Sequence, residues 1–355
     1  MINHFSGSYD PADVQFLLTP LDLPTISIAE KETLLRGHRR HYSEVLSAEA
    51  PPSAQYLAAY HAALAANGAR LARDIASLAA ALARRPVSPA GLALVSFARA
   101  GTPIGVLLRR ALARAGRAAP HYSISIVRDR GIDPTALDHI LARHAASDLV
   151  FVDGWTGKGA IAREMRNSAE LAARDINPAL VVIADPAGQA DLAATADDYV
   201  IPSGILNGII SGLVSRSVII PDAPPGQFHA CRALPELAEH DLSRAFVDLI
   251  DRLAEQIGPV PPADWPQAQR TERAAACARM IARLSADHAI TDINHIKPGV
   301  AEATRAVLRR EPRAVLVSGE ADAALQHLLL LCTERQVPVE WSDTLEGYRA
   351  VALLH

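Results

Sequence analysis

The sequence contains little cysteine, and its cysteines follow no pairing pattern. Cys231, Cys277 and Cys332 are odd in number and lie far apart along the 355 residues. A disulfide framework or a zinc site would place cysteines at short, regular spacings, and the 13 histidines contain no H-x3-H pair either. The sequence therefore predicts free thiols in a reducing cytoplasm and no metal site built from cysteine or histidine.

Long apolar runs and a large excess of one charge are also missing. No uninterrupted apolar run approaches the length of a membrane span. The first thirty residues lack a basic stretch before an apolar core, so we expect no signal peptide. The net charge of −4 gives no overall attraction to nucleic acids or membranes. We therefore expect a soluble, cytoplasmic protein without membrane contact, long enough for two domains.

Lysine is the third scarce residue. The chain has 35 lysines and arginines in total, but only Lys31, Lys158 and Lys297 are lysines. Arginine has thus taken most positions where any cation would serve. A lysine inside a glycine loop, as at Lys158, indicates a place where a compact ammonium group is needed.

The stretch around Lys158 has the pattern of an anion-binding loop. Residues 149–161 read LVFVDGWTGKGAI, which predicts a buried strand, a tight loop and the start of a helix. The backbone N–H groups at the first turn of a helix have no partner within it and suit a phosphate. Thr156 and Lys158 add side-chain donors, and Asp153 at the strand end is suited to accept from hydroxyls or to hold a metal.

The same loop has two other interpretations. A Walker-type loop needs four residues between its first glycine and the Gly-Lys pair, followed by Ser or Thr. Here Gly154 is too close to Lys158 and Gly159 follows the lysine, so that interpretation is rejected. An ordinary strand-to-helix turn, in which the glycines only permit tight packing, stays open.

The pattern of elements predicts an α/β fold with two domains. Residues 54–84 have apolar positions at helical spacing, and strands predicted at 92–97, 122–127, 149–152, 179–184 and 198–201 alternate with helical segments. This alternation predicts a mainly parallel sheet with helices on both faces. The predicted units are a domain at 1–257 with an N-terminal wrapping segment, a proline-rich linker at 258–270, and a small α/β sandwich at 271–355.

Polar side chains collect just after the predicted strands. Because the carboxyl ends of parallel strands meet at one edge of a sheet, these loops form a common crevice. The residues concerned are Arg99, Gly101, Arg128, Asp129, Arg130, Asp153, Thr156, Lys158 and Asp185.

These motifs resemble a known family. The segments SFARAGTPIGVLL from residue 96, HYSISIVRDRGID from residue 121 and VDGWTGKGAI from residue 152 are similar to the phosphoribosyltransferase-like proteins of tellurite-resistance-type gene clusters. Related sequences carry the name StiP-type cysteine protease. The likeness continues through IPSGILNG from residue 201 and SGLVSR from residue 211, and it covers most of residues 1–257.

The resemblance implies a type I phosphoribosyltransferase-like fold and a site for a phosphoribosyl donor with Mg²⁺. It puts the loop at Arg99 in the place of a pyrophosphate loop, Asp153 at the ribose hydroxyls, and residues 156–159 around the 5′-phosphate. The expected catalytic residues are Asp153, Arg99 and Lys158. The expected substrate-binding residues are Gly101, Thr102, Arg128, Asp129, Arg130, Gly154, Trp155, Thr156, Gly157, Gly159, Asp185, Ser203, Asn207 and Arg216.

One departure from the family pattern leaves other functions open. The familiar loop has two adjacent acids and more residues before Thr-Gly, whereas Gly154 stands here in place of the second acid. The leading hypothesis is an enzyme that transfers or cleaves a phosphoribosyl group on a nucleotide-like or base-like molecule. The alternative of a non-catalytic module that binds a nucleotide or RNA stays open. The sequence also leaves open whether the protein forms a homo-oligomer.

Cys231 carries the alternative of a cysteine protease. In a strand, His229 and Cys231 share a face, and a histidine can activate a thiolate. A buried structural cysteine is the rival interpretation, since no oxyanion-hole motif or third member of a triad is recognisable.

The C-terminal region resembles the RNA-binding domain of Pelota and ribosomal L7Ae-like proteins. The segment NHIKPGVAEATRAVLRR from residue 294 carries this likeness, and Gly299 opens a helix there. A helix N-terminus beside a cation can bind a backbone phosphate. The expected RNA-binding residues are Lys297, Arg305 and Arg309, and packing of this helix against the first domain is the rival interpretation.

Overall fold

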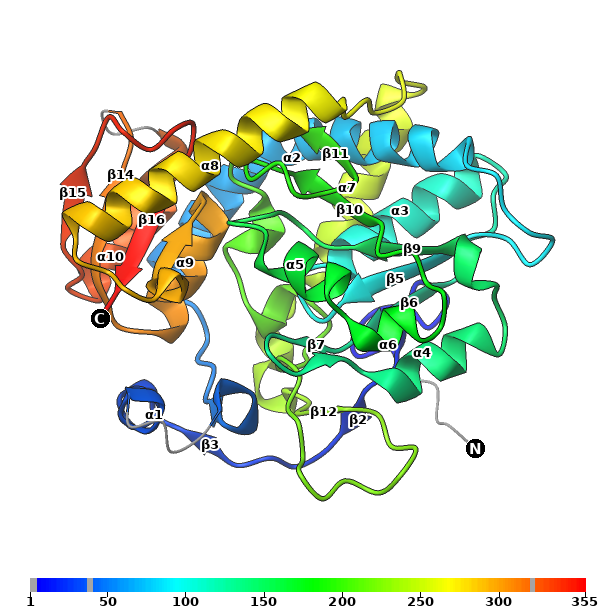
Figure 1. Cartoon of the computed structure of the whole chain (residues 1–355), viewed down its shortest axis with the longest axis horizontal. Coiled ribbons are helices and arrows are strands. Elements are labelled where there is room, and N and C mark those ends of the chain that lie inside the picture. The colour runs from blue at the N-terminus through cyan, green and yellow to red at the C-terminus, as the bar shows by residue number, and fades with distance from the viewer. Residues whose placement is uncertain (1–4, 37–40, 320–322) are drawn as a thin grey trace.

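The first domain is built on a parallel sheet with helices on both faces. The computed structural model describes residues 5–36, 41–319 and 323–355. Its largest sheet has six strands, all parallel to their neighbours (Figure 1). In spatial order they are β1 (Gln15–Phe16), β6 (His121–Ile124), β5 (Ala93–Phe97), β9 (Leu149–Val152), β10 (Leu180–Ala184) and β11 (Leu192–Thr195). The predicted fold class is confirmed.

The central strand β9 shows why this region forms a doubly covered sheet. All four of its side chains are buried, and successive side chains point to opposite faces. Leu149 and Phe151 belong to one hydrophobic cluster, while Val150 and Val152 belong to the other. A strand buried on both faces has to be apolar throughout, which is the pattern that predicted it.

Three helices of the first domain contribute to the cluster on each face. The first set is α2 (Ala54–Ala83), α3 (Thr102–Arg114) and α7 (Ser243–Ile257). The second set is α4 (Pro134–Leu141), α5 (Ala160–Arg166) and α6 (Ala169–Ala172). Helix α2 starts where Ser53 accepts from the backbone N–H of Tyr56. It continues through Gly68, which faces Ile250 and Leu253 of α7.

The outer strands were not all predicted correctly. The strand expected at 198–201 is wrong, because the residues there form a buried loop and β11 takes the edge of the sheet instead. Strand β11 reads Leu-Ala-Ala-Thr and lacks the apolar run that marks the inner strands. The opposite edge strand β1 lies in the N-terminal segment. Short pairs elsewhere are β2 (Thr19–Pro20) with β12 (Ala230–Cys231), β3 (Thr25–Ile26) with β4 (Leu46–Ser47), and β7 (Ile126–Val127) with β8 (Gly131–Ile132).

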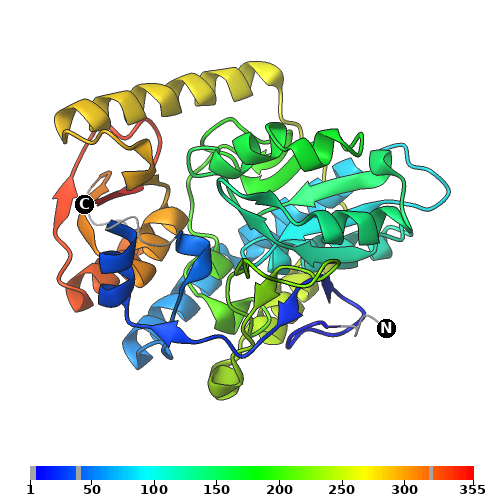
Figure 2. The same cartoon turned by 60° about the horizontal axis from the view of Figure 1, so that its bottom comes forward.

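The C-terminal domain has a four-stranded mixed sheet. In spatial order its strands are β13 (Ile296–Pro298), β16 (Ala350–Leu354), β14 (Pro312–Val317) and β15 (Val339–Trp341). Its helices are α8 (Gln267–Asp287), α9 (Val300–Arg309) and α10 (Gln326–Glu334). Helix α8 runs as a long rod from the first domain to the second (Figure 2). No helix of the described residues combines the length and apolar character needed to cross a bilayer.

The two domains are in close contact. A Cβ atom on Gly188 would lie 2.1 Å from the carbonyl oxygen of Arg270 in α8, so only glycine permits this approach. The Tyr348 hydroxyl donates to the Gly157 carbonyl at 2.7 Å. The Val300 N–H, at the start of α9, donates to Asp198 of the first domain at 2.9 Å. These contacts bring α9 next to the loop that follows β9.

Candidate functional site

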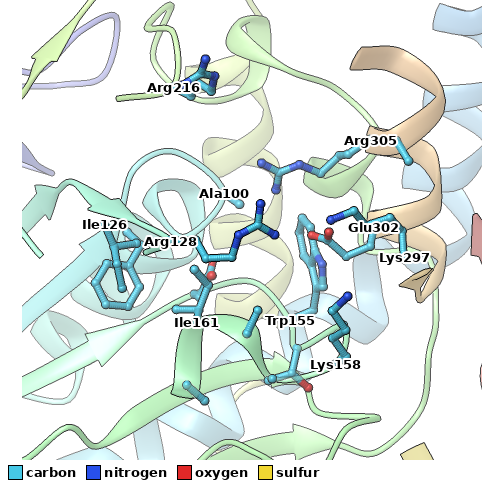
Figure 3. A pocket seen from close by; sticks show the side chains of 18 of the residues that line it. Ala100, Ile126, Arg128, Trp155, Lys158, Ile161, Arg216, Lys297, Glu302 and Arg305 are labelled. Carbon is cyan, nitrogen blue, oxygen red and sulfur yellow. The ribbon is translucent and has the colours of Figure 1, made fainter. Parts of the chain in front are cut away.

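A cavity of about 330 Å³ lies where the loop after β9 meets β13 and α9; we call it the first cavity. All three lysines of the chain line it, one from α1 (Ile28–Arg36), one from the loop after β9 and one from β13. Figure 3 shows several basic side chains directed toward one space, with Glu302 beside them. The predicted site residues that line it are Arg99, Arg128, Asp153, Trp155, Thr156, Gly157, Lys158, Gly159, Arg216, Lys297, Arg305 and Arg309.

Asp153 stands at the carboxyl end of β9, as predicted. Its Oδ1 accepts from the backbone N–H of Gly154 at 2.8 Å. Burial raises the pKa of Asp153 to about 7, against the opposing effects of the Gly154 N–H and of Arg305. Near neutral pH this carboxyl group is therefore poised between its acid and base forms, which suits a hydrogen-bond partner for hydroxyls or a proton carrier.

The two lysines at the domain junction have lowered pKa values. Burial, reinforced by Lys297 and Arg128, lowers the pKa of Lys158 to about 7. Burial also lowers the pKa of Lys297 to about 8, with Arg128 and Arg310 adding to the effect. The Lys158 Nζ donates to the carbonyl oxygens of Ile293 and Ile296, the latter at 2.9 Å. The C-terminal domain thus positions the ammonium group of the first domain.

Helix α9 contributes a charged face to the same cavity. Arg305 and Arg309 follow Glu302 by three and seven residues, so the three side chains lie on one side of the helix. The Arg305 guanidinium lies over the Trp155 ring, 5.4 Å from its centroid. Arg305, Lys297 and Arg309 outweigh the effect of burial and lower the pKa of Glu302. The structure thus places the residues predicted to bind RNA in the first cavity, packed against the first domain.

Glu302 is a site residue that the sequence reasoning missed. Its spacing from Arg305 and Arg309 is the signal that would have found it. The structure also brings it against the β9 loop, because a Cβ atom on Gly157 would lie 2.9 Å from the Glu302 Cγ. Two acids, Asp153 and Glu302, therefore line the cavity, one from each domain.

Arg99 is held by a buried ion pair. Its side chain is 3% exposed and pairs with Glu49, whose side chain is 16% exposed. It also donates to the Val214 carbonyl at 2.6 Å. Gly101 and Thr102, which follow in the same loop, do not line the first cavity. A Cβ atom on Gly101 would lie 2.4 Å from the Val152 carbonyl oxygen, and the Thr102 hydroxyl bonds that of Ser123 at 2.8 Å, so both support the loop.

Several predicted ligand contacts have protein partners instead. The Thr156 hydroxyl donates to Asp185, whose oxygens also accept from Ala190 N at 2.7 Å and Trp265 Nε1 at 3.1 Å. Asp185 is fully buried and is absent from the lining of the first cavity. We therefore correct its expected role from ligand contact to support of the loops after β9 and β10.

The loop at residues 128–130 is only partly at the cavity. Arg128 lines it and donates to Asn294 Oδ1 at 3.3 Å. Asp129 and Arg130 are not among the lining residues, since the Asp129 N–H donates to Glu164 and Arg130 lies 3.6 Å from Glu44.

The segment 203–216 meets the C-terminal domain. Asn207 accepts from Arg309 Nε at 2.9 Å. Ser203 and Asn207 line a small neighbouring cavity of about 10 Å³, and Arg216 lines the first cavity. Gly154 is buried next to the lining residues Asp153 and Trp155.

The cysteines do not form an exposed reactive site. Cys231 is fully buried in β12, and burial raises its pKa to about 12. The His229 Nδ1 lies 2.8 Å from the Ser125 hydroxyl. Cys332 has a pKa raised to about 12 by burial, and burial also raises that of Cys277. Among the described residues, no group of three or more His, Cys, Asp or Glu side chains is arranged to hold a metal ion.

Comparisons with known proteins identify relatives of the whole chain. Residues 7–251 match the family described as "Tellurite-like stress resistance cysteine protease StiP". Residues 275–355 match the family described as "PELOTA RNA binding domain". A protein of Acinetobacter baylyi named "Cysteine protease StiP" is 40% identical over 362 residues, covering 99% of this chain and 94% of the relative.

A solved structure was also matched, but it carries no argument. An amino transferase from Eubacterium rectale is 10% identical, with 95% of this chain and 83% of that chain covered, but the TM-score of 0.22 supports no inference. The Acinetobacter baylyi relative, by contrast, matches 99% of this chain at 40% identity. The chain therefore belongs to the StiP family and carries a C-terminal PELOTA RNA-binding domain.

Proposed function

We propose that the first cavity binds a phosphorylated ribose or nucleotide, and that the chain is a phosphoribosyltransferase-like enzyme acting on a nucleotide-like or base-like molecule. The observation that carries the proposal is that all three lysines of the chain line this one cavity. All other Lys or Arg positions of the chain are arginine, so the composition of the chain does not explain why its lysines lie together here. A compact ammonium group binds phosphate as a point charge.

The charge balance of the cavity supports an anionic ligand. Nine cationic residues line it but only two acids, Asp153 and Glu302. Burial and mutual repulsion lower the pKa values of Lys158 and Lys297. A bound phosphate would compensate the positive charges and raise these pKa values again, so binding and protonation favour each other.

The two acids suit the other parts of such a ligand. Asp153 and Glu302 belong to different domains and both line the cavity. Mg²⁺ in nucleotide sites is commonly held by one or two carboxylates together with substrate phosphates, and the donors present fit that arrangement. When bound, the ion would neutralise phosphate charge. The chain's own residues would hold the phosphate through Lys158 and Lys297 and orient the ribose hydroxyls through Asp153.

Calorimetry and product analysis test the proposal together. The full chain is titrated with ribose 5-phosphate, 5-phosphoribosyl 1-diphosphate and nucleoside monophosphates, with and without Mg²⁺. We expect binding that Asp153→Asn weakens, and release of pyrophosphate when the diphosphate donor is incubated with a base. Binding without any turnover would leave a non-catalytic nucleotide-binding protein. Absence of binding to every ligand of the panel would overturn the proposal.

Ligand affinity should decrease as the pH rises from 7 to 9. Lys158, with a pKa of about 7, and Lys297, with a pKa of about 8, lose their protons across this interval. Hydrogen bonds to charged groups contribute roughly 1.5–3 kcal/mol each. We therefore expect affinity for ribose 5-phosphate to fall by about tenfold or more, because 1.4 kcal/mol corresponds to a factor of ten. Calorimetry at pH 8 in buffers of different ionisation enthalpy should detect proton uptake.

A charge-preserving variant is the control for this pH profile. Arginine stays protonated throughout the range, so Lys297→Arg should bind with a shallower decrease between pH 7 and 9. A wild-type affinity that is constant or rises over this interval would contradict the assignment of the lysines to phosphate.

A cysteine protease is the second candidate function. The names of the matched family and of the relative support it more directly than a transferase. Only Cys231 of the three cysteines lies within residues 7–251, so it is the candidate nucleophile. Its burial and raised pKa oppose this role, because the thiolate is the reactive form.

Alkylation measures directly whether Cys231 is reactive. We expect iodoacetamide at pH 7 to label Cys231 at least a hundredfold more slowly in the native protein than in denaturant. The reason is that, at a pKa of about 12, the thiolate is a very small fraction and is enclosed. Peptide mapping by mass spectrometry gives the rates. Rapid native labelling, together with peptidase activity that Cys231→Ser abolishes, would instead establish the protease.

We also propose RNA as a partner of the C-terminal domain, on the description of the family that residues 275–355 match. Lys297, Arg305 and Arg309 line the first cavity. An RNA that contacts them must enter this cavity or separate the domains. Competition between a short single-stranded RNA and ribose 5-phosphate would support this, and simultaneous unperturbed binding would place the RNA on another surface.

A further inference from the structure

A second cavity of about 470 Å³ adjoins the first. It lies among the segment 46–53, the start of α2, residues 205–209 and the helices α9 and α10. Ile28 of α1 also lines it. The volume is within the range of small-molecule sites, roughly 300–1,000 Å³.

The walls of the second cavity combine apolar side chains with charged ones, among them Lys31, Arg99 and Glu334. Its apolar lining residues include Ile28, Leu46, Ile205, Leu206, Leu308 and Leu331. The polar groups include Ser47 and Asn207. The buried Ser47 hydroxyl has no hydrogen-bond partner among the described residues. A cavity of this size with apolar walls and convergent polar groups is typical of a ligand site.

The two cavities share part of their lining. Arg99, Arg216, Arg309 and Lys31 line both. The small cavity of about 10 Å³ joins residues of the two sides, since Arg305 of the first cavity and Leu206 of the second both line it. The two cavities therefore have a common wall of cationic side chains.

We propose that the second cavity binds the base of a nucleotide whose phosphorylated ribose occupies the first cavity. The inference rests on the function proposed above and names its ligand as an intact nucleotide. A flat heteroaromatic ring has apolar faces for the leucine and isoleucine walls, and polar edges that can meet Asn207. Glu49 is engaged, because its carboxylate accepts from Arg99 and from the Gly208 N–H at 2.9 Å. The acid therefore does not repel the ligand as a free charge would.

Filling the second cavity from its rim tests the proposal. Ile28 is half-buried at the start of α1, so Ile28→Trp places an indole in the cavity with little disturbance of the core. The matched control is Ala29→Trp, which adds the same side chain to an exposed neighbouring position outside both cavities. Ser47→Leu fills the same cavity from a different element. The full-length proteins are titrated calorimetrically with ribose 5-phosphate and with AMP, GMP, CMP and UMP.

The expected results separate the two proposals. In the wild type, at least one nucleoside monophosphate should bind tenfold or more tightly than ribose 5-phosphate. Ile28→Trp and Ser47→Leu should abolish that advantage and leave ribose 5-phosphate binding within twofold, and Ala29→Trp should match the wild type. If ribose 5-phosphate binds and no nucleotide binds more tightly, the second-cavity inference is wrong and the proposed function stands. If neither class binds, both are wrong.

Discussion

Replacing Lys158 with methionine should weaken the binding of ribose 5-phosphate by roughly 30- to 150-fold. This corresponds to the loss of about 2–3 kcal/mol for one charge-assisted contact in a buried site. Methionine fills a similar volume but has no charge. The ammonium group lies in a cavity that it shares with Lys297 and Arg305, so its removal takes away one centre of the expected phosphate contact. Isothermal titration at pH 7 measures the change.

Two further variants separate a role in binding from a role in folding. Lys158 Nζ also donates to the Ile293 and Ile296 carbonyls, so Lys158→Met loses a link between the domains. Lys297→Met removes the neighbouring ammonium group and should weaken binding to a similar extent. Arg166→Met is the matched control, because it removes a cation from an exposed position of α5, the helix that follows the Lys158 loop, and Arg166 does not line the cavity.

The outcome that contradicts the assignment is equally specific. If Lys158→Met and Lys297→Met are folded, as judged by thermal unfolding, and bind ribose 5-phosphate within twofold of the Arg166→Met control, the lysines are not its phosphate ligands. The cavity would then need another explanation for its three lysines.

The inner part of the fold was predictable because its determinants are local. Residues 149–152 are apolar on both faces, and the glycines that follow fix the turn into α5, so sequence and structure agree there. Strand β11 was not predicted, because its determinants are not local. Its short alanine-rich sequence becomes a strand only by pairing with β10, and that pairing is a tertiary effect that no local pattern contains.

Only the part of the candidate site that the first domain contributes was predictable. The carboxyl ends of the strands pointed to Asp153 and Lys158, since the geometry of a parallel sheet brings these ends together. The sequence offered docking of α9 on the first domain only as the rival to RNA binding, because this docking depends on contacts between residues about 150 positions apart, such as Arg349 N–H with Asp198. For this reason Glu302 was missed, and the cations of α9 were not assigned to the cavity beside Asp153.

The same non-local contacts make Asp198 the residue whose loss should most weaken the junction between the domains. Asp198 is 7% exposed. Its carboxylate accepts from the Val300 N–H at 2.9 and 3.1 Å and from the Arg349 N–H at 2.8 Å. Val300 is the first residue of α9, and Gly299 before it has no side chain with which to cap the helix. An acid of the first domain therefore supplies the cap for a helix of the second.

Asp198→Ala should reduce the free energy of unfolding by about 3–5 kcal/mol, because two buried N–H groups lose a charged acceptor and find no replacement. Asp198→Asn retains one carbonyl oxygen, so its loss should be about half as large. Denaturation in urea measures both, and calorimetry should find weaker binding of ribose 5-phosphate in Asp198→Ala, since α9 carries Glu302, Arg305 and Arg309 into the cavity. Equal stability of the alanine variant and the wild type would mean that the other interdomain contacts hold α9 in place without this cap. Unchanged ligand affinity in a destabilised variant would mean that the first domain binds the ligand alone, and the composite site proposed here would be wrong.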